Sequence, residues 1–572
     1  MKTFCFVVVL AFVVAMTGTV DAAPEDYGEW SLVGQGNISY SNSALIRLST
    51  PQPDLFVTAS VHQDGASSAQ LMHFSTDQGV TWEPMFRVEA GSGFCGIYKF
   101  IHMVLDVHFF DAARGVRGGF GAWDQCFDML PEPICLACIF FNGTEAYTTE
   151  DGGETWQPSK LIGTPTNGSF SVIQMLDDQV GYAGGQYGTL ALTTDGGKTW
   201  THQGNPDPAM DEWEVNVEDV FFLDDVTGYA ATGMYDDYFY DPYLTDAETP
   251  QQIVDWMLHK ARLLRDPFYR RDFRESAGGS KGAYGKILKT TDGAQTWQVL
   301  YEDQARMFYR VRFLDEQTGF AISESFRHTA PWYVLMRTTD GGETWDMADL
   351  PGWGEIPGAI GPYALYDVKF ASDKLGFLLV GAPSVPYYRT TIFYTVDGGM
   401  TWNLDDFSDG WWDPIDIEFV GRDAYVVGQA FMTMKYAGVD STPVADAGED
   451  QTVDLGATVT LDGSGSYDLD GDPLIYTWAQ TDGAAETLDD ASAVDPTFTA
   501  GEVGAYTFAL VVADAEHDSE PDTVTVTVVE PAEDDDDTAP IDDDNDTDDD
   551  DDDDDAAVTG DDDDDDNGSC GC

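Results

Sequence analysis

Thr193-Thr-Asp195-Gly-Gly197-Lys-Thr199-Trp200 is one of six copies of a short pattern, S/T-x-D-x-G-x-T-W, within the first four hundred residues of the chain. The other copies occupy residues 75–82, 149–156, 290–297, 338–345 and 395–402. A pattern that recurs in order along a chain is typical of stacked supersecondary units, each too small to bury its own apolar face. The sequence therefore predicts a repeat architecture rather than one irregular core.

The residue types of this pattern suit a tight turn and carry no catalytic signature. Asp and Thr side chains cap backbone N–H groups, and Gly supplies a positive φ that other residues resist. The Trp is large enough to anchor the turn against a neighbouring unit. We therefore predict a structural role for Asp77, Asp151, Asp195, Asp292, Asp340, Asp397, Trp82, Trp156, Trp200, Trp297, Trp345 and Trp402. Ala294 stands in the fourth copy where the other five have Gly, which predicts a strained or altered turn there.

A second signal precedes each turn: an alternating apolar strand, an acidic turn, and then Gly followed by an aromatic residue. Residues 220–230 and 311–321 show it most clearly. Period-two alternation indicates half-buried strands, so one unit reads as a four-stranded blade of a β-propeller. Six units carry the turn and a seventh, over 415–436, lacks it. Residues 28–33 imitate the end of a turn and could complete that unit, which favours seven blades over six or eight.

These motifs resemble known families. The turn is similar to the Asp-box (BNR repeat) of sialidase-type propellers. A longer pattern joins two motifs, V-x-F-L-D-x-x-T-G-[YF]-A and then T-T-D-G-G-x-T-W. This pattern is similar to that of photosystem II stability and assembly factor-like propellers, over about residues 28–436. This resemblance implies a non-enzymatic binding or assembly propeller. The chain departs from the compact version of that family by insertions within 111–140 and 234–284.

Composition limits where the protein works and what it binds. Residues 1–22 read as a signal peptide, which predicts a secreted, periplasmic or cell-surface bacterial protein. The formal net charge of −76 argues against nucleic-acid binding, since phosphate attraction needs a basic surface. The predicted propeller spans residues 23–437.

Four cysteines gather in one stretch of the predicted propeller. In an exported protein they favour two extracellular disulfides. The candidates are Cys95, Cys126, Cys135 and Cys138. Cys135 and Cys138 also have CxxC spacing, which leaves metal binding or redox chemistry as an alternative. Connectivity stays open at this point.

Residues 234–284 interrupt the strand pattern with a helical one. Thr249-Pro250 suits a helix start and Pro267 a helix end. Eight of the 27 Lys and Arg residues of this acidic chain lie in 259–286. A solvated cap on the propeller is one interpretation, and a docking site for an anionic partner is the other. The candidate partner-binding residues are Trp256, Arg262, Arg265, Arg270, Arg271 and Arg274.

A second domain begins near residue 442. The run Val459-Thr-Leu-Asp-Gly-Ser-Gly-Ser466, with Trp478 downstream, is similar to polycystic kidney disease (PKD) domains and covers 442–530. The resemblance implies a β-sandwich with Trp478 in its core. Asp468, Asp470 and Asp472 could converge on Ca²⁺, which prefers oxygen ligands, although Asp and Gly are also ordinary turn residues. No other cofactor is indicated.

Residues 531–572 form an Asp-rich tail that ends in Cys570-Gly-Cys572. Like charges at this density repel each other and predict a disordered segment. The terminal sequence resembles the start of a bacterial sorting signal, so membrane anchoring is one reading and a disulfide the other. The oligomeric state is open.

The sequence thus predicts an all-β protein: an Asp-box propeller, a PKD-type sandwich and an acidic tail. The favoured function is a non-catalytic scaffold that binds an envelope protein or an extracellular glycan. The alternative is a sialidase-like or other glycoside hydrolase that uses the propeller face. A sialidase needs clustered arginines and an early Arg-Ile-Pro-like element. Here only Ile46-Arg47-Leu48-Ser49 approaches that element, so no catalytic residue is assigned.

Overall fold

The computed structural model describes residues 29–35, 43–63, 68–89, 100–126, 138–165, 168–207, 215–234, 284–325, 332–352, 356, 362–383, 388–405, 414–428, 432–438 and 440–531. All regular elements within these ranges are β-strands, so the predicted all-β class is confirmed. No helix among the described residues has the length and apolarity needed to cross a membrane.

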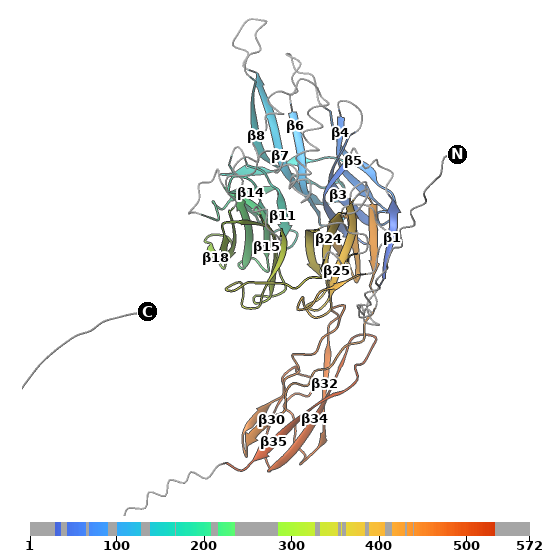
Figure 1. Ribbon diagram of the computed structural model, residues 1–572, viewed down its shortest axis with the longest axis vertical. Coiled ribbons are helices and arrows are strands. Elements are labelled where there is room, and N and C mark those ends of the chain that lie inside the picture. The colour runs from blue at the N-terminus through green and yellow to red at the C-terminus, as the bar shows by residue number, and fades with distance from the viewer. Residues whose placement is uncertain are drawn as a thin grey trace, which may run out of the picture.

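Seven sheets form the propeller between residues 29 and 437 (Figure 1). Each has four antiparallel strands in chain order, except that β1 (Glu29–Gln35) completes the seventh sheet and the parallel strand β10 (Lys160–Ile162) extends the third. Blade 1 consists of β2 (Ser43–Gln52), β3 (Leu55–Gln63), β4 (Ser68–Ser75) and β5 (Glu83–Glu89). Blade 2 consists of β6 (Phe100–Phe109), β7 (Gly115–Cys126), β8 (Cys138–Thr149) and β9 (Gln157–Pro158). Blade 3 consists of β11 (Val172–Met175), β12 (Gly181–Gly184), β13 (Leu190–Thr193) and β14 (Thr199–His202). A short strand, β10 (Lys160–Ile162), adds to β14 in parallel.

Blades 4 to 7 repeat this plan. Their strands are β15 (Asn216–Phe222), β16 (Gly228–Met234), β17 (Tyr284–Thr290) and β18 (Gln298–Asp303); β19 (Arg306–Phe313), β20 (Gly319–Ser325), β21 (Tyr333–Thr338) and β22 (Asp346–Met347); β23 (Ala364–Phe370), β24 (Gly376–Pro383), β25 (Tyr388–Thr395) and β26 (Asn403–Leu404); β27 (Pro414–Val420), β28 (Asp423–Gly428), β29 (Met432–Ala437) and β1 (Glu29–Gln35). The first strand of each blade contacts the first strand of the next, and β27 contacts β2, so the ring is closed.

The seventh blade takes its outer strand from the N-terminal end of the described chain, as the sequence predicts. β1 pairs antiparallel with β29, with Trp30 opposite Tyr436. The Trp30 ring is buried against Phe377 of blade 6 and Tyr436, with ring centroids 5.4 and 5.5 Å away. Hydrogen bonds between the two ends of the propeller remove the exposed sheet edge that an open ring would present.

The Asp-box turns satisfy their own backbone through side chains. In the second copy, Thr149 Oγ1 donates to Asp151 Oδ1 at 2.8 Å and accepts from the N–H of Gly153 at 2.9 Å. Asp151 in turn accepts from the Thr155 N–H at 2.8 Å and its hydroxyl at 2.6 Å. These hydrogen bonds hold the pKa of Asp151 below its usual range. The Ser/Thr–Asp bond and the Asp–amide bond recur in the other five copies.

The fourth Asp-box turn has Ala294 at the position where the other copies have glycine. Its φ is +68°, the left-handed conformation that glycine adopts in the other copies. The Ala294 N–H still donates to Thr290 Oγ1, at 3.1 Å. An alanine in this conformation costs about 1–2 kcal/mol relative to a relaxed one. The turn is therefore strained, as the sequence predicts, but its geometry is not altered.

Aromatic rings join neighbouring blades. In the fourth blade, Phe222 stacks on Tyr182 of the third, with centroids 3.5 Å apart, and meets the Asp-box Trp297 edge-on at 6.1 Å. The same arrangement recurs one and two blades further on, in the sets Tyr229–Phe313–Trp345 and Phe320–Phe370–Trp402. The recurring Gly-aromatic and strand-end Phe positions thus form the blade interfaces, because each supplies one ring to a shared stack.

The second domain is a β-sandwich below the ring in Figure 1. One sheet has the order β30-β35-β34-β32 and the other pairs β31 with β33. The strands are β30 (Gln451–Asp454), β31 (Thr458–Thr460), β32 (Ile475–Asp482), β33 (Thr497–Thr499), β34 (Gly504–Ala513) and β35 (Asp522–Val529). Trp478 is buried in the core between the sheets, as predicted, and its indole N–H donates to the Ala493 carbonyl at 3.1 Å.

Candidate functional site: the propeller channel

The inner strands present a layer of buried charge to the propeller axis. Six side chains, one from each of β2, β6, β15, β19, β23 and β27, form what we call the buried charge layer. Its members are Arg47, Asp106, Asp219, Arg310, Asp367 and Asp416, none more than 7% exposed. Burial of so many ionisable groups is costly unless they are paired, so their partners decide what the layer can do.

The two arginines of the layer pair with carboxylates of other blades. Arg47 Nε lies 3.3 Å from Asp106 Oδ1, and its Nη1 lies 3.8 Å from Asp416. Arg310 Nε lies 3.4 Å from Asp367. Burial by itself would raise the pKa of Asp367, but the charges of Arg312 and Arg310 outweigh it and hold the pKa well below its usual range. Asp367 is therefore ionised, and ion pairs between blades hold the arginines and carboxylates of the layer in place.

Three of the carboxylates also connect adjacent blades through the backbone. Asp106 accepts the Ile173 N–H at 2.7 Å, and Asp219 accepts the Val311 N–H at 3.1 Å. Asp416 accepts the Leu48 N–H at 2.8 Å. Each inner strand of blades 2, 4 and 7 is thus bonded to the inner strand of the following blade. The buried charge layer is in this respect part of the ring's construction.

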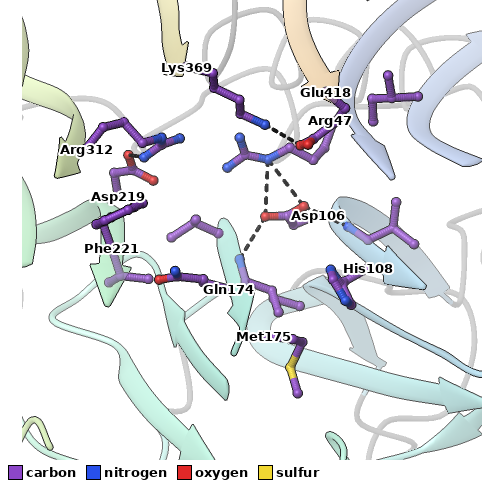
Figure 2. A pocket seen from close by; sticks show the side chains of 15 residues that line it. Arg47, Asp106, His108, Gln174, Met175, Asp219, Phe221, Arg312, Lys369 and Glu418 are labelled. Atoms are coloured by element: carbon purple, nitrogen blue, oxygen red, sulfur yellow. Dashed lines mark hydrogen bonds and ion pairs between the residues drawn. The ribbon is translucent and has the colours of Figure 1, made fainter. Parts of the chain in front are cut away.

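The next inward-facing position along β6, β15, β19, β23 and β27, together with Gln174 of β11, forms a second, partly exposed layer, which we call the mouth layer. Its members are His108, Gln174, Phe221, Arg312, Lys369 and Glu418. Together with Arg47, Asp106 and Asp219 of the buried charge layer, they line a cavity of about 200 Å³ (Figure 2). Arg312 pairs with Asp219, and Lys369 pairs with Glu418. Burial raises the pKa of Glu418, and the Lys369 charge opposes that rise.

A second cavity of about 360 Å³ adjoins the first and shares Phe221, Arg312 and Lys369 with it. Phe313, Phe370 and Ser372 also line this space. The Arg312 guanidinium lies 5.8 Å from the centre of the Phe221 ring, within cation–π range. The mouth of the channel therefore offers an apolar ring beside the Arg312 cation, and Lys369 lines the same cavities.

His108 of the mouth layer is neutral over most of the physiological range. Burial lowers its pKa to about 4, although the Asp106 charge opposes that shift. An unfolded histidine titrates near 6.5. The folded state therefore binds fewer protons between pH 6.5 and 4, and stability falls as the pH falls through that window.

We expect the His108 ring resonances to titrate with a midpoint near pH 4 in the folded protein. We also expect His108→Gln to flatten the dependence of unfolding free energy on pH between about 6.5 and 4. Two-dimensional NMR and urea denaturation across that range measure both. A midpoint near 6.5 would show that the ring is solvated rather than held in the channel wall.

The residues that the sequence singled out lie elsewhere. The Asp-box turns are at the ends of the third strands of the blades, and none of their residues lines either channel cavity. The insertion residues Trp256, Arg262, Arg265, Arg270, Arg271 and Arg274 fall outside the described part of the chain. Strand register places Cys126 opposite Cys138, whereas Cys95 and Cys135 also lie outside the described residues.

The predicted calcium ligands lie at the junction of the two domains, and an arginine of the propeller reaches them. Asp468 Oδ1 accepts the backbone N–H groups of Asp470 and Gly471, both at 3.0 Å, which is turn chemistry. Asp470 and Asp472 both pair with Arg422 of blade 7. Burial and the neighbouring Asp468 raise the pKa of Asp470 to about 7. Asp470 and Asp472 lie close enough to Asp440 for the three carboxylates to hold one ion, whereas Asp468 is not part of that group, and the calcium site stays a prediction.

The sequence analysis missed both channel layers, although a signal for them was present. Aligned on their acidic turns, five inner strands read Asp106-Val-His-Phe, Asp219-Val-Phe-Phe, Arg310-Val-Arg-Phe, Asp367-Val-Lys-Phe and Asp416-Ile-Glu-Phe. A charged residue at the first place of these segments, with a mostly polar residue two positions later and apolar residues at the second and fourth places, marks positions that face a common axis.

Comparison with known proteins agrees with this architecture. A family model that describes a PKD domain matches residues 447–528. A curated relative, the photosystem II assembly lipoprotein Ycf48 of Nostoc sp., is 28% identical over 184 residues, which are 31% of this chain and 49% of the relative. The chain thus spans about half the length of the curated relatives that it matches.

Two solved structures are similar at low identity. The structure described as YCF48 bound to D1 peptide is 13% identical, covers 72% of this chain and 98% of its own, and has a TM-score of 0.41. A Hadza microbial sialidase is 13% identical, covers 70% of this chain and 66% of its own, and has a TM-score of 0.30. The curated relatives show that the chain is similar to Ycf48-like propellers, and the family model shows that it carries a PKD domain after its propeller.

Proposed function

We propose that this protein is a secreted, non-catalytic scaffold that binds a protein segment at the cell envelope through the mouth of its propeller. The proposal rests on one observation: the carboxylates of the buried charge layer are held by hydrogen bonds and ion pairs within the ring. Asp106, Asp219 and Asp416 each accept a strand N–H of the next blade, and Asp367 pairs with Arg310. A catalytic acid or nucleophile must be able to reach its substrate, whereas hydrogen bonds and ion pairs within the ring hold these carboxylates in place.

The chemistry of the mouth layer suits an extended peptide. Phe221 supplies an apolar surface, and Arg312 and Lys369 line both cavities with it. A peptide with an acidic or carboxyl-terminal group next to an apolar side chain complements this arrangement. The similarity to relatives named as assembly lipoproteins supports a partner that is a protein. The predicted signal peptide supports an envelope location.

The alternative remains a glycoside hydrolase, which would require two carboxylates placed on either side of a sugar linkage. Glu418 is the one carboxylate among the six described residues of the mouth layer, and it pairs with Lys369. We therefore place this alternative second.

The test compares capture of envelope proteins by the mature wild-type chain and by Phe221→Ser, with retained proteins identified by mass spectrometry. We expect one protein to be retained by the wild type and lost by the variant. Val226→Ser, an exposed apolar residue on the turn of the same blade, is the matched control and should retain it. A variant lacking residues 235–283 tests the predicted insertion surface separately.

Incubation with envelope and extracellular polysaccharides completes the test. Release of shortened glycans by the wild type would contradict the scaffold proposal and support the hydrolase. Capture that is unchanged in Phe221→Ser would move the binding surface away from the channel mouth.

A further inference from the structure

A cluster of three carboxylates and one imidazole lies where the linker meets the PKD-type domain. We call it the junction cluster; it comprises Asp440 of the linker and Asp514, Glu516 and His517 of the hairpin between β34 and β35. Nothing in the channel site involves these residues. They lie together because the linker passes beside this hairpin as it enters the domain.

The hairpin is folded so that two of these side chains meet. Asp514 Oδ1 accepts the backbone N–H groups of Glu516 and His517, both at 2.6 Å. The Asp514 N–H in turn donates to the His517 carbonyl at 3.1 Å. One oxygen of Asp514 is therefore used to close the turn, and the other, Oδ2, lies on the side of the His517 ring.

The distances between the side-chain atoms match those between ligands of one metal ion. His517 Nδ1 lies 3.4 Å from Asp440 Oδ2 and 3.8 Å from Asp514 Oδ2. One atom from each of the three residues lies within 4.8 Å of the other two. Ligands at about 2.0–2.2 Å from a tetrahedral ion are roughly 3.3–3.6 Å apart, so small side-chain movements would complete such a set.

The cluster also contains a buried oxygen that no described residue bonds. The side chain of Asp514 is 1% exposed, yet its Oδ2 makes no hydrogen bond within the described part of the chain. An ionised carboxylate in that position is costly unless a cation faces it. Glu516 adds a further carboxylate in contact with Asp440. Arg422 contacts Asp440 from the propeller side and is shared with Asp470 and Asp472.

We propose that the junction cluster binds one divalent transition-metal ion of the Zn²⁺ type, with Asp440, Asp514 and His517 as ligands. The imidazole selects this class, because Ca²⁺ and Mg²⁺ prefer oxygen ligands alone. His517 and Asp440 are partly exposed, at 41% and 24% of their side-chain areas, so the ion can enter from solvent and keep a water ligand. Glu516 is the nearest further carboxylate.

The ion would fasten the linker to the sandwich. Asp440 would then hold Arg422 of blade 7 through one oxygen and the ion through the other. Ser372 Oγ of blade 6 already donates to the Leu469 carbonyl of the sandwich at 2.8 Å. Metal binding would thus stiffen a contact that joins the two domains.

The experiment measures Zn²⁺ binding by the full mature chain in competition with a chromophoric chelator. The wild type is compared with His517→Ala and His517→Gln, and all three keep the Asp-rich tail, so that the tail is the same in each comparison. We expect the wild type to hold one Zn²⁺ that both variants bind at least about tenfold more weakly, on the order of the loss seen when a metal site loses a supporting group. Asp518→Asn, an exposed carboxylate of the same hairpin, should bind like the wild type.

Two results would overturn the proposal. Equal Zn²⁺ binding by wild type and both His517 variants would leave the cluster as an ion pair between His517 and its carboxylates. Displacement of Zn²⁺ by equimolar Ca²⁺ would indicate a site built of oxygen atoms alone. Circular dichroism of the metal-free variants establishes that they are folded, so that a loss of binding reports on the ligand.

Discussion

Replacing Asp367 with alanine is expected to lower the free energy of unfolding by about 3–5 kcal/mol, the usual cost of removing one partner of a buried ion pair. Asp367 has no exposed surface and pairs with Arg310 at 3.4 Å and Arg312 at 3.5 Å. Its Oδ1 also accepts the Val368 N–H at 2.9 Å. Without the carboxylate, buried guanidinium charge loses a counter-ion in a region that water reaches poorly. Urea denaturation followed by circular dichroism measures the loss.

Asp373→Ala is the matched control, because it removes a carboxylate from the turn that follows the same strand. Asp373 is 67% exposed and lies 3.9 Å from Lys374. Exposed pairs of this kind contribute little, so the change should stay within about 0.5 kcal/mol of wild type. A loss below about 1 kcal/mol for Asp367→Ala would show that the arginines find solvent or other carboxylates, and that the buried charge layer contributes little to stability.

Replacing Trp30 with alanine is expected to cost about 3–5 kcal/mol, the range found for large aromatic residues in cores. Trp30 lies on the strand that closes the ring and packs against Phe377 and Tyr436. The variant loses this packing where the two ends of the propeller meet, so we also expect faster proteolysis near β1. Thermal denaturation and limited proteolysis with mass spectrometry measure the two effects.

Ser31→Ala tests whether the effect belongs to the closing ring rather than to the strand. Ser31 is exposed and its hydroxyl donates to the Lys435 carbonyl at 3.5 Å, so its replacement should change little. If Trp30→Ala were as stable as Ser31→Ala, β1 would not be needed to hold the ring closed.

How much of this molecule could be predicted depends on how far apart the interacting residues are in sequence. The Asp-box turn could be read directly, since Asp151 bonds to Thr155 four positions later. The strand pattern also predicted the blades and the contribution of residues near 28 to the seventh blade, because alternation is a local property of each strand. Even the strain at Ala294 follows from a single residue type in a known turn.

The candidate site could not be read in this way, because its partners come from different blades. Asp106 bonds to an amide 67 positions away, and Arg312 pairs with Asp219 across 93 positions. The sequence showed these charges on inner strands but could not show which charge neutralises which, or that one layer is buried and the next partly exposed.

The sequence by itself therefore determined the all-β class, the turns and the PKD-type domain, because each rests on residues within a few positions of one another. Only the tertiary structure decided what the charged residues do. Arg422 illustrates the difference: in the sequence it is one basic residue after a strand, and in the fold it reaches Asp470 and Asp472 of another domain. An ion pair depends on distance in space and on burial, and closure of the ring and docking of the sandwich set both.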